Sequence, residues 1–261
     1  MIGGEYILYI DTKSQDSIKK SLCYILNVNS YDIDDLMKDC YDKLEANQYL
    51  DLDDQYEYFK EYIKDHLIYS IDEIEFIHLS RRLDNDNYTY NFKDVFIKET
   101  SLSKYLRSYG ITFTYDQHMK MYIKGNEQDI KQWNSLDSSI GGYAFMDKIE
   151  KSDGYNNAIG GPEFFGHLYL YDIDDDVVID EYINNTHFYL FEYVIPLKDI
   201  EFESYEDLNE EEKMYHMIII ALQRLYFHKY DPMFNEQENQ VLKVCHNKIL
   251  DAKYLVNKKD L

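Results

Sequence analysis

The spacing of apolar positions predicts a helical region at the beginning of the chain. Between residues 17 and 67, apolar side chains recur every three or four residues, which places them on one face of a helix. Asp53 or Asp54 stands where a carboxylate can cap the free amides of a helix. We therefore predict a mainly helical N-terminal region over residues 1–73. The elements expected in it are a short strand at 6–10 and helices at 17–26, 31–46 and from Asp53 or Asp54 to 63.

From residue 74 to residue 206 the pattern changes to short apolar runs separated by loops. The run 111–115 alternates and is rich in β-branched and aromatic residues, as strands are. It follows a short helix that ends at Gly110, because glycine readily adopts the left-handed conformation that closes helices. The acidic triplet 174–176 has the composition of a turn. The elements expected are strands at 75–80, 111–115, 167–173, 177–183 and 187–195, and short helices at 101–109 and 126–133.

The last part of the chain, residues 207–261, returns to helical spacing. Asn209 and Glu212 have the arrangement of a capping box before an amphipathic stripe, and the same arrangement begins again at Asn235. Two successive helices predict a C-terminal α-hairpin. The expected fold class is therefore α+β, with a helical N-terminal part, a central β-rich domain of antiparallel or mixed strands, and a C-terminal helical hairpin.

The charge of the chain narrows the classes of partner. It has 50 acidic and 27 basic residues, a formal net charge of −23, and 28 tyrosines among 261 residues. Such a chain repels nucleic acid and acidic membrane surfaces, so we expect neither as a partner. Acidic clusters mixed with tyrosine suit docking on a basic protein, although acidity also serves solubility alone. A protein partner is expected, and the sequence leaves self-association open.

The composition also indicates a soluble, cytoplasmic protein. The three cysteines, Cys23, Cys40 and Cys245, are sparse and widely spaced, as in a reducing compartment rather than in a disulfide framework. The N-terminus has neither the basic nor the apolar segment of a secretory signal. The longest apolar run, near 217–222, is too short to span a bilayer.

One acidic stretch, Asp172–Asp180, invites comparison with a calcium-binding loop. Its aspartates match several ligand positions of such a loop. However, Val177 stands where the loop needs glycine, and Ile183 stands where it needs a bidentate glutamate. We expect a solvated turn here and no metal cofactor.

Glycines gather in the centre of the chain. Five of the ten lie in two groups, Gly141–Gly142 and Gly160–Gly166. Glycine permits positive φ and close backbone approach, so these segments are expected to form shaped loops. Such loops either bind ligands or make tight turns, and they lack the G-x-G-x-x-G and P-loop patterns that cradle phosphate.

Five residues of the central region form the candidate site. His78 and Ser80 lie in an apolar strand, and Tyr143 and Tyr155 lie in and beside the glycine-rich segment. Glu192 lies between apolar and aromatic neighbours in a later strand and is followed four residues later by proline. This order of parts resembles that of ADP-ribosyltransferase-like folds.

The resemblance covers roughly residues 74–203 and implies a role for each candidate. In that family a first-strand Arg or His holds the NAD ribose or phosphate, and a middle-strand side chain packs on nicotinamide. A later Glu stabilises the cation that forms as nicotinamide leaves, which is electrostatic stabilisation of a transition state. The resemblance thus implies NAD as substrate. It implies that His78, Tyr143 and Glu192 are catalytic, and that His78, Ser80, Tyr143 and Tyr155 bind the cofactor.

Two functions follow from these observations. The first is an NAD-consuming transferase or glycohydrolase acting as a bacterial or phage toxin, or in antiviral defence or counter-defence. The second is a non-enzymatic acidic binding or inhibitor protein that docks on a basic partner protein. They differ in one geometric requirement, because only the enzyme needs His78, Tyr143 and Glu192 to converge on a common pocket.

Overall fold

The fold is α+β, as the apolar pattern predicts. A computed structural model describes residues 9–46, 51–84, 87, 89–118, 120–125, 130–133, 139–173, 176–231, 238–245 and 250–261. In these ranges, none of the helices has the length and apolar character that crossing a membrane requires.

The chain folds into two compact units. Unit 1 comprises Met1–Phe76, Tyr143–Ile149 and Val194–Leu242, and unit 2 comprises Ile77–Gly142, Glu150–Tyr193 and Lys243–Leu261. Each unit is thus assembled from three separate stretches of chain. The contiguous regions expected from the sequence, 1–73, 74–206 and 207–261, do not coincide with these units.

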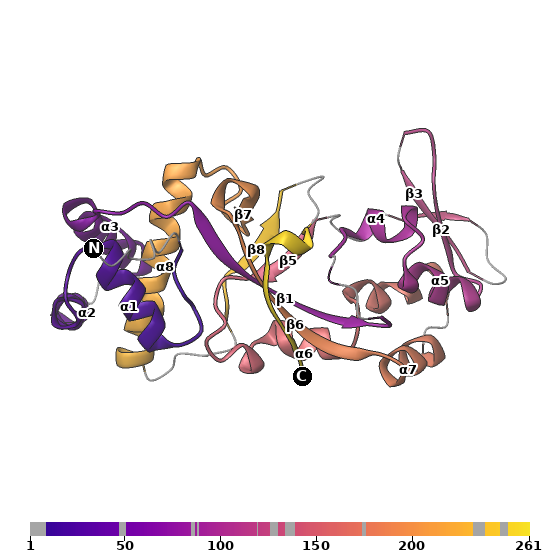
Figure 1. Cartoon of the computed structure of the whole chain (residues 1–261), viewed down its shortest axis with the longest axis horizontal. Helices are drawn as coiled ribbons and strands as arrows, with labels where there is room; N and C mark the ends of the chain where they lie inside the picture. The colour runs from indigo at the N-terminus through magenta and orange to yellow at the C-terminus, as the bar shows by residue number, and fades with distance from the viewer. Residues whose placement is uncertain are drawn as a thin grey trace. The chain divides into compact units, whose positions relative to one another are not determined.

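The helices described in unit 1 are built on the predicted apolar faces. They are α1 (Gln15–Ile25), α2 (Ser30–Ala46), α3 (Leu52–His66) and α8 (Glu210–Tyr230). Capping boxes at Ser14, Asp51 and Asn209 begin α1, α3 and α8, because the cap side chains satisfy amides that a helix leaves free. Helix α8 packs against α1 and α3 (Figure 1), and their apolar stripes form the core of the unit.

The larger sheet has the strand order β7–β8–β5–β1–β6–β9 among the described residues. Strand β9 runs antiparallel to β6 at one edge, with a register shift between Glu192 and Tyr193. Strand β1 therefore lies between β5 and β6, which puts His78 and Glu192 on neighbouring strands. The strands are β1 (Glu73–Arg82), β5 (Ile140–Tyr143), β6 (His187–Pro196), β7 (Ile200–Phe202), β8 (Val241–Val244) and β9 (Leu255–Asp260).

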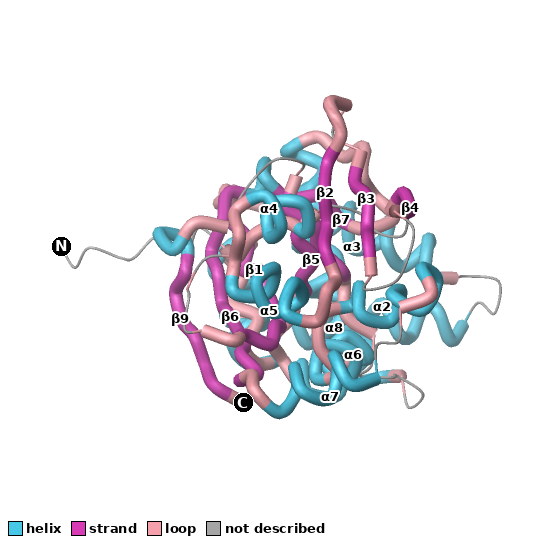
Figure 2. The backbone as a smooth tube through the Cα atoms, turned by 90° about the vertical axis from the view of Figure 1, so that its right-hand side faces the viewer, coloured by secondary structure: helices cyan, strands magenta, loops and turns pink. Residues whose placement is uncertain are grey.

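A smaller sheet lies in unit 2. Strands β2 (Thr112–Tyr115), β3 (Met121–Lys124) and β4 (Lys131–Gln132) pair antiparallel in that order and lie side by side in Figure 2. Half of the buried core beside them is aromatic, namely Phe96, Trp133, Phe164, Phe165, Tyr171 and Tyr182. The helices are α4 (Phe92–Ile97), α5 (Ser101–Ser108), α6 (Asp153–Ile159), α7 (Asp176–Asn184) and the 3-10 helix η2 (Glu163–Tyr171).

Several sequence predictions are confirmed in the central part of the chain. The run 75–80 lies inside β1, 111–115 contains β2, and 187–195 lies inside β6. Helix α5 occupies the segment expected at 101–109 and is followed by Gly110, whose φ of 74° is in the left-handed region.

Two strands predicted in the centre are wrong, because both segments are helical. Residues 167–171 belong to η2, and 177–183 lie in α7. In η2 the buried residues Phe165, Leu168 and Tyr171 recur at steps of three, which is the period of a 3-10 helix. This spacing buries one face of each segment, and it outweighs the local alternation that indicated strands.

The C-terminal α-hairpin is wrong in its second helix. Helix α8 is present with its capping box, but the chain after it forms β8 and β9. Leu242 and Val244 are buried and alternate with partly exposed neighbours, which is the period of a strand. Strand β4 replaces the end of the helix expected at 126–133. Four expected features lie wholly or partly outside the described residues: 6–8, 126–129, 174–175 and the cap at Asn235.

Candidate functional site

The structure places His78 and Glu192 on neighbouring strands but on opposite faces of the sheet. The ring of His78 lies 6.1 Å from that of Phe191, and the guanidinium of Arg82 lies 5.0 Å from the same ring. His78, Arg82 and Phe191 therefore share one face. Glu192 follows Phe191 directly, and successive side chains of a strand point to opposite faces. The imidazole and the carboxylate thus do not meet in one pocket.

Tyr155 lies on the face of Glu192. The Tyr155 ring packs edge-on against Phe188 at 5.2 Å, and Phe188 precedes Glu192 by four residues in the same strand, so the two share a face. Arg81 lies on this face too, 5.7 Å from the Phe188 ring, and its Nε donates to the carbonyl oxygen of Ile159 at 2.5 Å. Glu192 itself is fully buried.

His78 is held as a neutral imidazole. Its Nδ1 donates a hydrogen bond to the carbonyl oxygen of Gly141 at 2.9 Å, an acceptor that requires the proton on Nδ1. Burial and, to a smaller extent, the charge of Arg82 together lower the pKa of His78 to about 4. The Ser80 hydroxyl, on the same face, donates to the carbonyl oxygen of Arg81 at 3.4 Å. This face therefore offers a neutral histidine beside an arginine.

Tyr143, the remaining predicted residue, ends strand β5 and belongs to unit 1, whereas His78 and Glu192 belong to unit 2. The five candidates are therefore divided three ways. His78 and Ser80 share one sheet face in unit 2, Tyr155 and Glu192 share the other, and Tyr143 is in unit 1.

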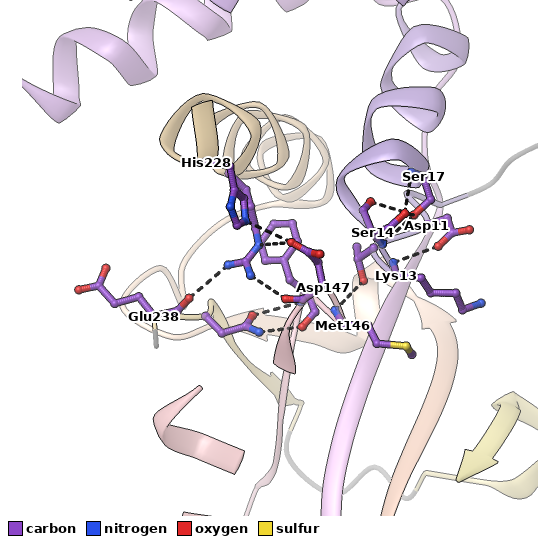
Figure 3. A network of polar contacts seen from close by, with 12 residues as sticks. Asp11, Lys13, Ser14, Ser17, Met146, Asp147, His228 and Glu238 are labelled. Carbon is purple, nitrogen blue, oxygen red and sulfur yellow. Dashed lines mark hydrogen bonds and ion pairs between the residues drawn. The ribbon is translucent and has the colours of Figure 1, made fainter. Parts of the chain in front are cut away.

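A buried polar network in unit 1 centres on Asp147 (Figure 3). Arg224 donates from Nη2 to the Asp147 carbonyl oxygen at 2.7 Å, and its Nε is 3.8 Å from the carboxylate. His228 Nε2 lies 3.1 Å from the same carboxylate. Arg224 Nη1 also donates to the carbonyl oxygen of Glu238 at 3.2 Å. The contacts join helix α8 to two other segments of the unit.

The network continues through Thr12 to the turn before α1. The Thr12 carbonyl accepts from the Asp147 amide at 2.8 Å, and its hydroxyl accepts from the Met146 amide at 3.1 Å. The Glu75 carboxylate accepts from the Thr12 amide at 2.7 Å and from the Thr12 hydroxyl. Lys13 Nζ lies 3.8 Å from Glu75. Thr12 and Glu75 are fully buried, so we interpret the network as a structural framework closed to a substrate.

Sequence reasoning missed this framework. Its partners are far apart along the chain, with Thr12 and Glu75 separated by 63 positions and Asp147 and Arg224 by 77. One local signal was present, because Arg224 stands between apolar residues of the α8 stripe, two after Leu222 and one before Leu225. A charge on the buried face of a helix indicates a buried partner.

A surface of unit 1 combines carboxylates with tyrosine rings. Tyr56 Oη is 3.3 Å from His216 Nδ1, and the Tyr205 ring centroid is 4.4 Å from that of His216. Burial raises the pKa of Tyr56, and Tyr205, Glu57 and Glu212 raise it further. We call this the acidic–tyrosine surface and define it as Tyr56, Glu57, Tyr205, Glu206, Asp207, Glu210, Glu211 and Glu212.

The acidic–tyrosine surface is both charged and accessible. The segment 201–212 contains seven acidic residues and no basic one. Glu206, Asp207 and the three glutamates 210–212 are exposed, and 47 % of Tyr205 is exposed. The Tyr205 ring packs on His216, which is only 2 % exposed. Burial lowers the pKa of His216 to about 4.

The charge of the whole chain is divided unevenly between the units. Unit 1 has 30 acidic and 12 basic residues, a net charge of −18, whereas unit 2 has 20 and 15, a net charge of −5. In the described part of the chain, no group of three or more His, Cys, Asp or Glu side chains is arranged to hold a metal ion.

No family model, curated protein or solved structure matches the chain. What the protein does is therefore inferred from its own geometry and charge.

Proposed function

We propose that this protein is a non-enzymatic acidic binding protein, of the inhibitor or adaptor kind, that docks on a basic partner protein through unit 1. The observation that carries the proposal is the net charge of −18 on unit 1 against −5 on unit 2. Solubility would be served equally well by charge on either unit. Charge of one sign concentrated on one unit favours a partner of the opposite sign.

The acidic–tyrosine surface supplies both stages of such docking. Its carboxylates attract a basic surface over about 10 Å at moderate ionic strength, which speeds and orients the encounter. Tyr205 then offers an accessible ring face to an arginine or lysine, an interaction of about 0.5–1 kcal/mol at exposed sites. Tyrosine is also among the residues enriched in protein interfaces.

The basic partner we favour is a protein that itself binds nucleic acid. Its binding face is positively charged, and carboxylates spaced along segment 201–212 present negative charge in place of phosphates. Occupation of that face would inhibit the partner. This action suits the toxin, defence or counter-defence setting that the sequence suggests.

The geometry gives less support to the NAD-consuming hypothesis. That hypothesis requires His78, Tyr143 and Glu192 in a common pocket. The contacts of Phe191 and Phe188 put His78 and Glu192 on opposite faces instead.

Charge reversal at the acidic–tyrosine surface tests the proposal. The variant E206K/D207K/E210K/E211K keeps the capping pair Asn209 and Glu212 and should bind a labelled peptide of alternating arginine and serine at least ~10-fold more weakly than the wild type. Fluorescence anisotropy in a salt series measures the affinity. Wild-type affinity should also fall steeply as salt rises.

The matched control is E150K/E163K/D176K/D180K, which reverses four exposed acids of unit 2 and changes the net charge of the chain equally. Its affinity for the peptide should stay within about twofold of the wild type. Equal losses in the two variants, or affinity indifferent to salt, would contradict docking through unit 1.

A further inference from the structure

An exposed aromatic and aliphatic patch lies at the C-terminal ends of α1 and α3 in unit 1. Ile68 is 60 % exposed and Tyr69 is 39 % exposed. The Tyr69 ring stacks on that of Tyr24 in α1, with centroids 4.8 Å apart and planes 12° apart. We call Tyr24, Ile68 and Tyr69 the Tyr24–Tyr69 patch. Large apolar side chains grouped on a surface often mark an interaction site.

The backbone fixes the position of this patch. The amides of Ile68 and Tyr69 both donate to the carbonyl oxygen of Ile25, at 3.1 and 3.2 Å. This carbonyl belongs to the last turn of α1, whose acceptors a helix leaves free. Two bonds to one buried anchor hold Ile68 and Tyr69 against the helix end while leaving their side chains accessible. Little ordering is therefore needed when a partner binds.

The surroundings of the patch favour a cation. The last turn of α1 has no basic residue, although the C-terminus of a helix carries partial negative charge. Asp32 lies in the first turn of α2, which packs against both α1 and α3. Burial raises the pKa of Cys23 in α1 and of Tyr62 in α3, and the charge of Asp32 raises each further. Lys19 is engaged with Asp34 at 2.8 Å. Stacked tyrosine rings add faces that attract guanidinium and ammonium groups.

We propose that the Tyr24–Tyr69 patch is the anchor point for a basic, amphipathic segment of the partner protein. An arginine of that segment lies over Tyr69, and a neighbouring apolar side chain covers Ile68. This inference rests on the proposed function and deepens it, because it says which contact adds to attraction by charge. A second copy of this chain is disfavoured as the occupant, since two units of net charge −18 repel each other.

Unit 2 offers a chemically matched patch without the same charge. Tyr169 is 63 % exposed and Leu170 is 50 % exposed, so the pair has the composition and accessibility of Tyr69 and Ile68. The unit around it has a net charge of only −5. Asp172, two residues after Leu170, forms an ion pair with Lys131. If exposure alone decided binding, both patches would contribute equally.

The experiment compares two labelled peptides on the wild type and three variants of the full chain. One peptide alternates arginine and serine, and the other has leucine in place of serine at helical spacing. The leucine peptide should bind the wild type about tenfold more tightly than the serine peptide. The variant I68S/Y69A should lose that advantage, whereas the matched variant Y169A/L170S should keep it. Tyr69→Phe should also keep it, because the stacked ring remains.

Each outcome decides the proposal. An advantage that persists in I68S/Y69A, or that Y169A/L170S also loses, overturns the anchor while the serine peptide still reports on charge-led docking. Binding of neither peptide overturns the proposed function itself. Concentration-dependent dimerisation of the wild type that I68S/Y69A abolishes would instead assign the patch to a second copy. Should the double variant fold poorly, Ile68→Ser alone answers the question, because that side chain is mostly exposed.

Discussion

Unit 1 and unit 2 differ in charge and in the chemistry of their interiors. Unit 1 carries a net charge of −18 and, beside its apolar helix stripes, buries the charged side chains Glu75, Asp147 and Arg224 in a hydrogen-bonded framework. Unit 2 has a net charge of −5, and half of its buried core around Trp133 consists of aromatic rings. Phe165 and Tyr182, for example, meet edge to face at 5.0 Å.

The difference shows which kind of contact the stability of each unit depends on. Ring packing is distributed over many neighbours, and its loss is felt as a cavity. A buried carboxylate depends on a few specific partners, and removing one member of the set leaves another charge without compensation. The unit with the charged interior is also the one that exposes the tyrosine surfaces proposed to bind a partner.

The largest effect is expected from Phe165→Ala, and it should fall on unit 2. Phe165 is 2 % exposed, packs on Phe164 at 4.7 Å and lies next to Gly161, where an added Cβ would come within 3.2 Å of its ring. Truncation should cost about 3–5 kcal/mol of unfolding free energy. Urea unfolding followed by fluorescence measures it in the right unit, because the single tryptophan of the chain, Trp133, lies in this core.

The control for this variant is Tyr169→Ala, at an exposed position of the same unit, which should change stability by less than about 0.5 kcal/mol. A loss below about 1 kcal/mol for Phe165→Ala would mean that the aromatic core does not dominate unit 2.

A loss of about 3 kcal/mol is expected from Asp147→Ala, and it should fall on unit 1. The variant leaves Arg224 and His228 buried without the carboxylate that lies beside both. Unfolding followed by far-UV circular dichroism, which α1, α2, α3 and α8 dominate, reports on this unit. Asp207→Ala, at an exposed position, is the control and should be nearly neutral. Equal shifts in the Trp133 signal and in dichroism would show that the two units unfold together.

The smallest effect is a pH dependence that His216 should give to unit 1. Burial lowers the pKa of His216 to about 4 in the folded protein, whereas in the unfolded chain this pKa should be about 6.5. Between these two pH values the unfolded state therefore binds a proton more readily than the folded state. The contribution of His216 to the free energy of unfolding is complete above the pKa of the unfolded chain. It is lost as the pH falls toward the pKa of the folded protein, and the free energy of unfolding should decrease by about 2 kcal/mol between pH 7 and pH 4.5.

His216→Phe should remove this part of the pH dependence, because phenylalanine can occupy the space between Phe202 and Tyr205 without titrating. Dichroism-detected urea unfolding at both pH values gives the difference between the variant and the wild type. His187→Gln, at an exposed histidine of unit 2, is the control. Parallel pH profiles for wild type and His216→Phe would count against a buried neutral imidazole.

The fold could be predicted well where neighbouring residues decide it. The cap at Asn209 and the end of α5 before Gly110 each depend on residues within about one turn of a helix. The start of α3 differs from the prediction, because Asp51 is its cap and Asp53 and Asp54 lie in its first turn. The predictions failed where an apolar segment could satisfy two periods. The segment 167–173 alternates locally like a strand, but Leu168 and Tyr171 lie in the 3-10 helix η2. Their helical spacing has an effect only when the surrounding core covers one face of the segment.

The candidate site was less predictable than the fold. The order of His78, Ser80, Tyr143, Tyr155 and Glu192 along the chain contains no information on which sheet face each residue occupies. Phe191 and Glu192 are adjacent in sequence yet point apart, so a shift of one residue decides whether a carboxylate meets the imidazole. The polar framework was hidden for a related reason, since Thr12 meets Glu75 across 63 positions.

Local chemistry in the chain was thus sufficient for its α+β class, the capping box at Asn209 and its acidic character, because each of these depends on composition or on residues within a few positions. Which side chains meet was decided only in three dimensions. Strand pairing put His78 and Glu192 on opposite faces, and the folding of distant segments joined Asp147 to Arg224. Contacts of this kind depend on register and burial, which arise when remote parts of the chain pack together.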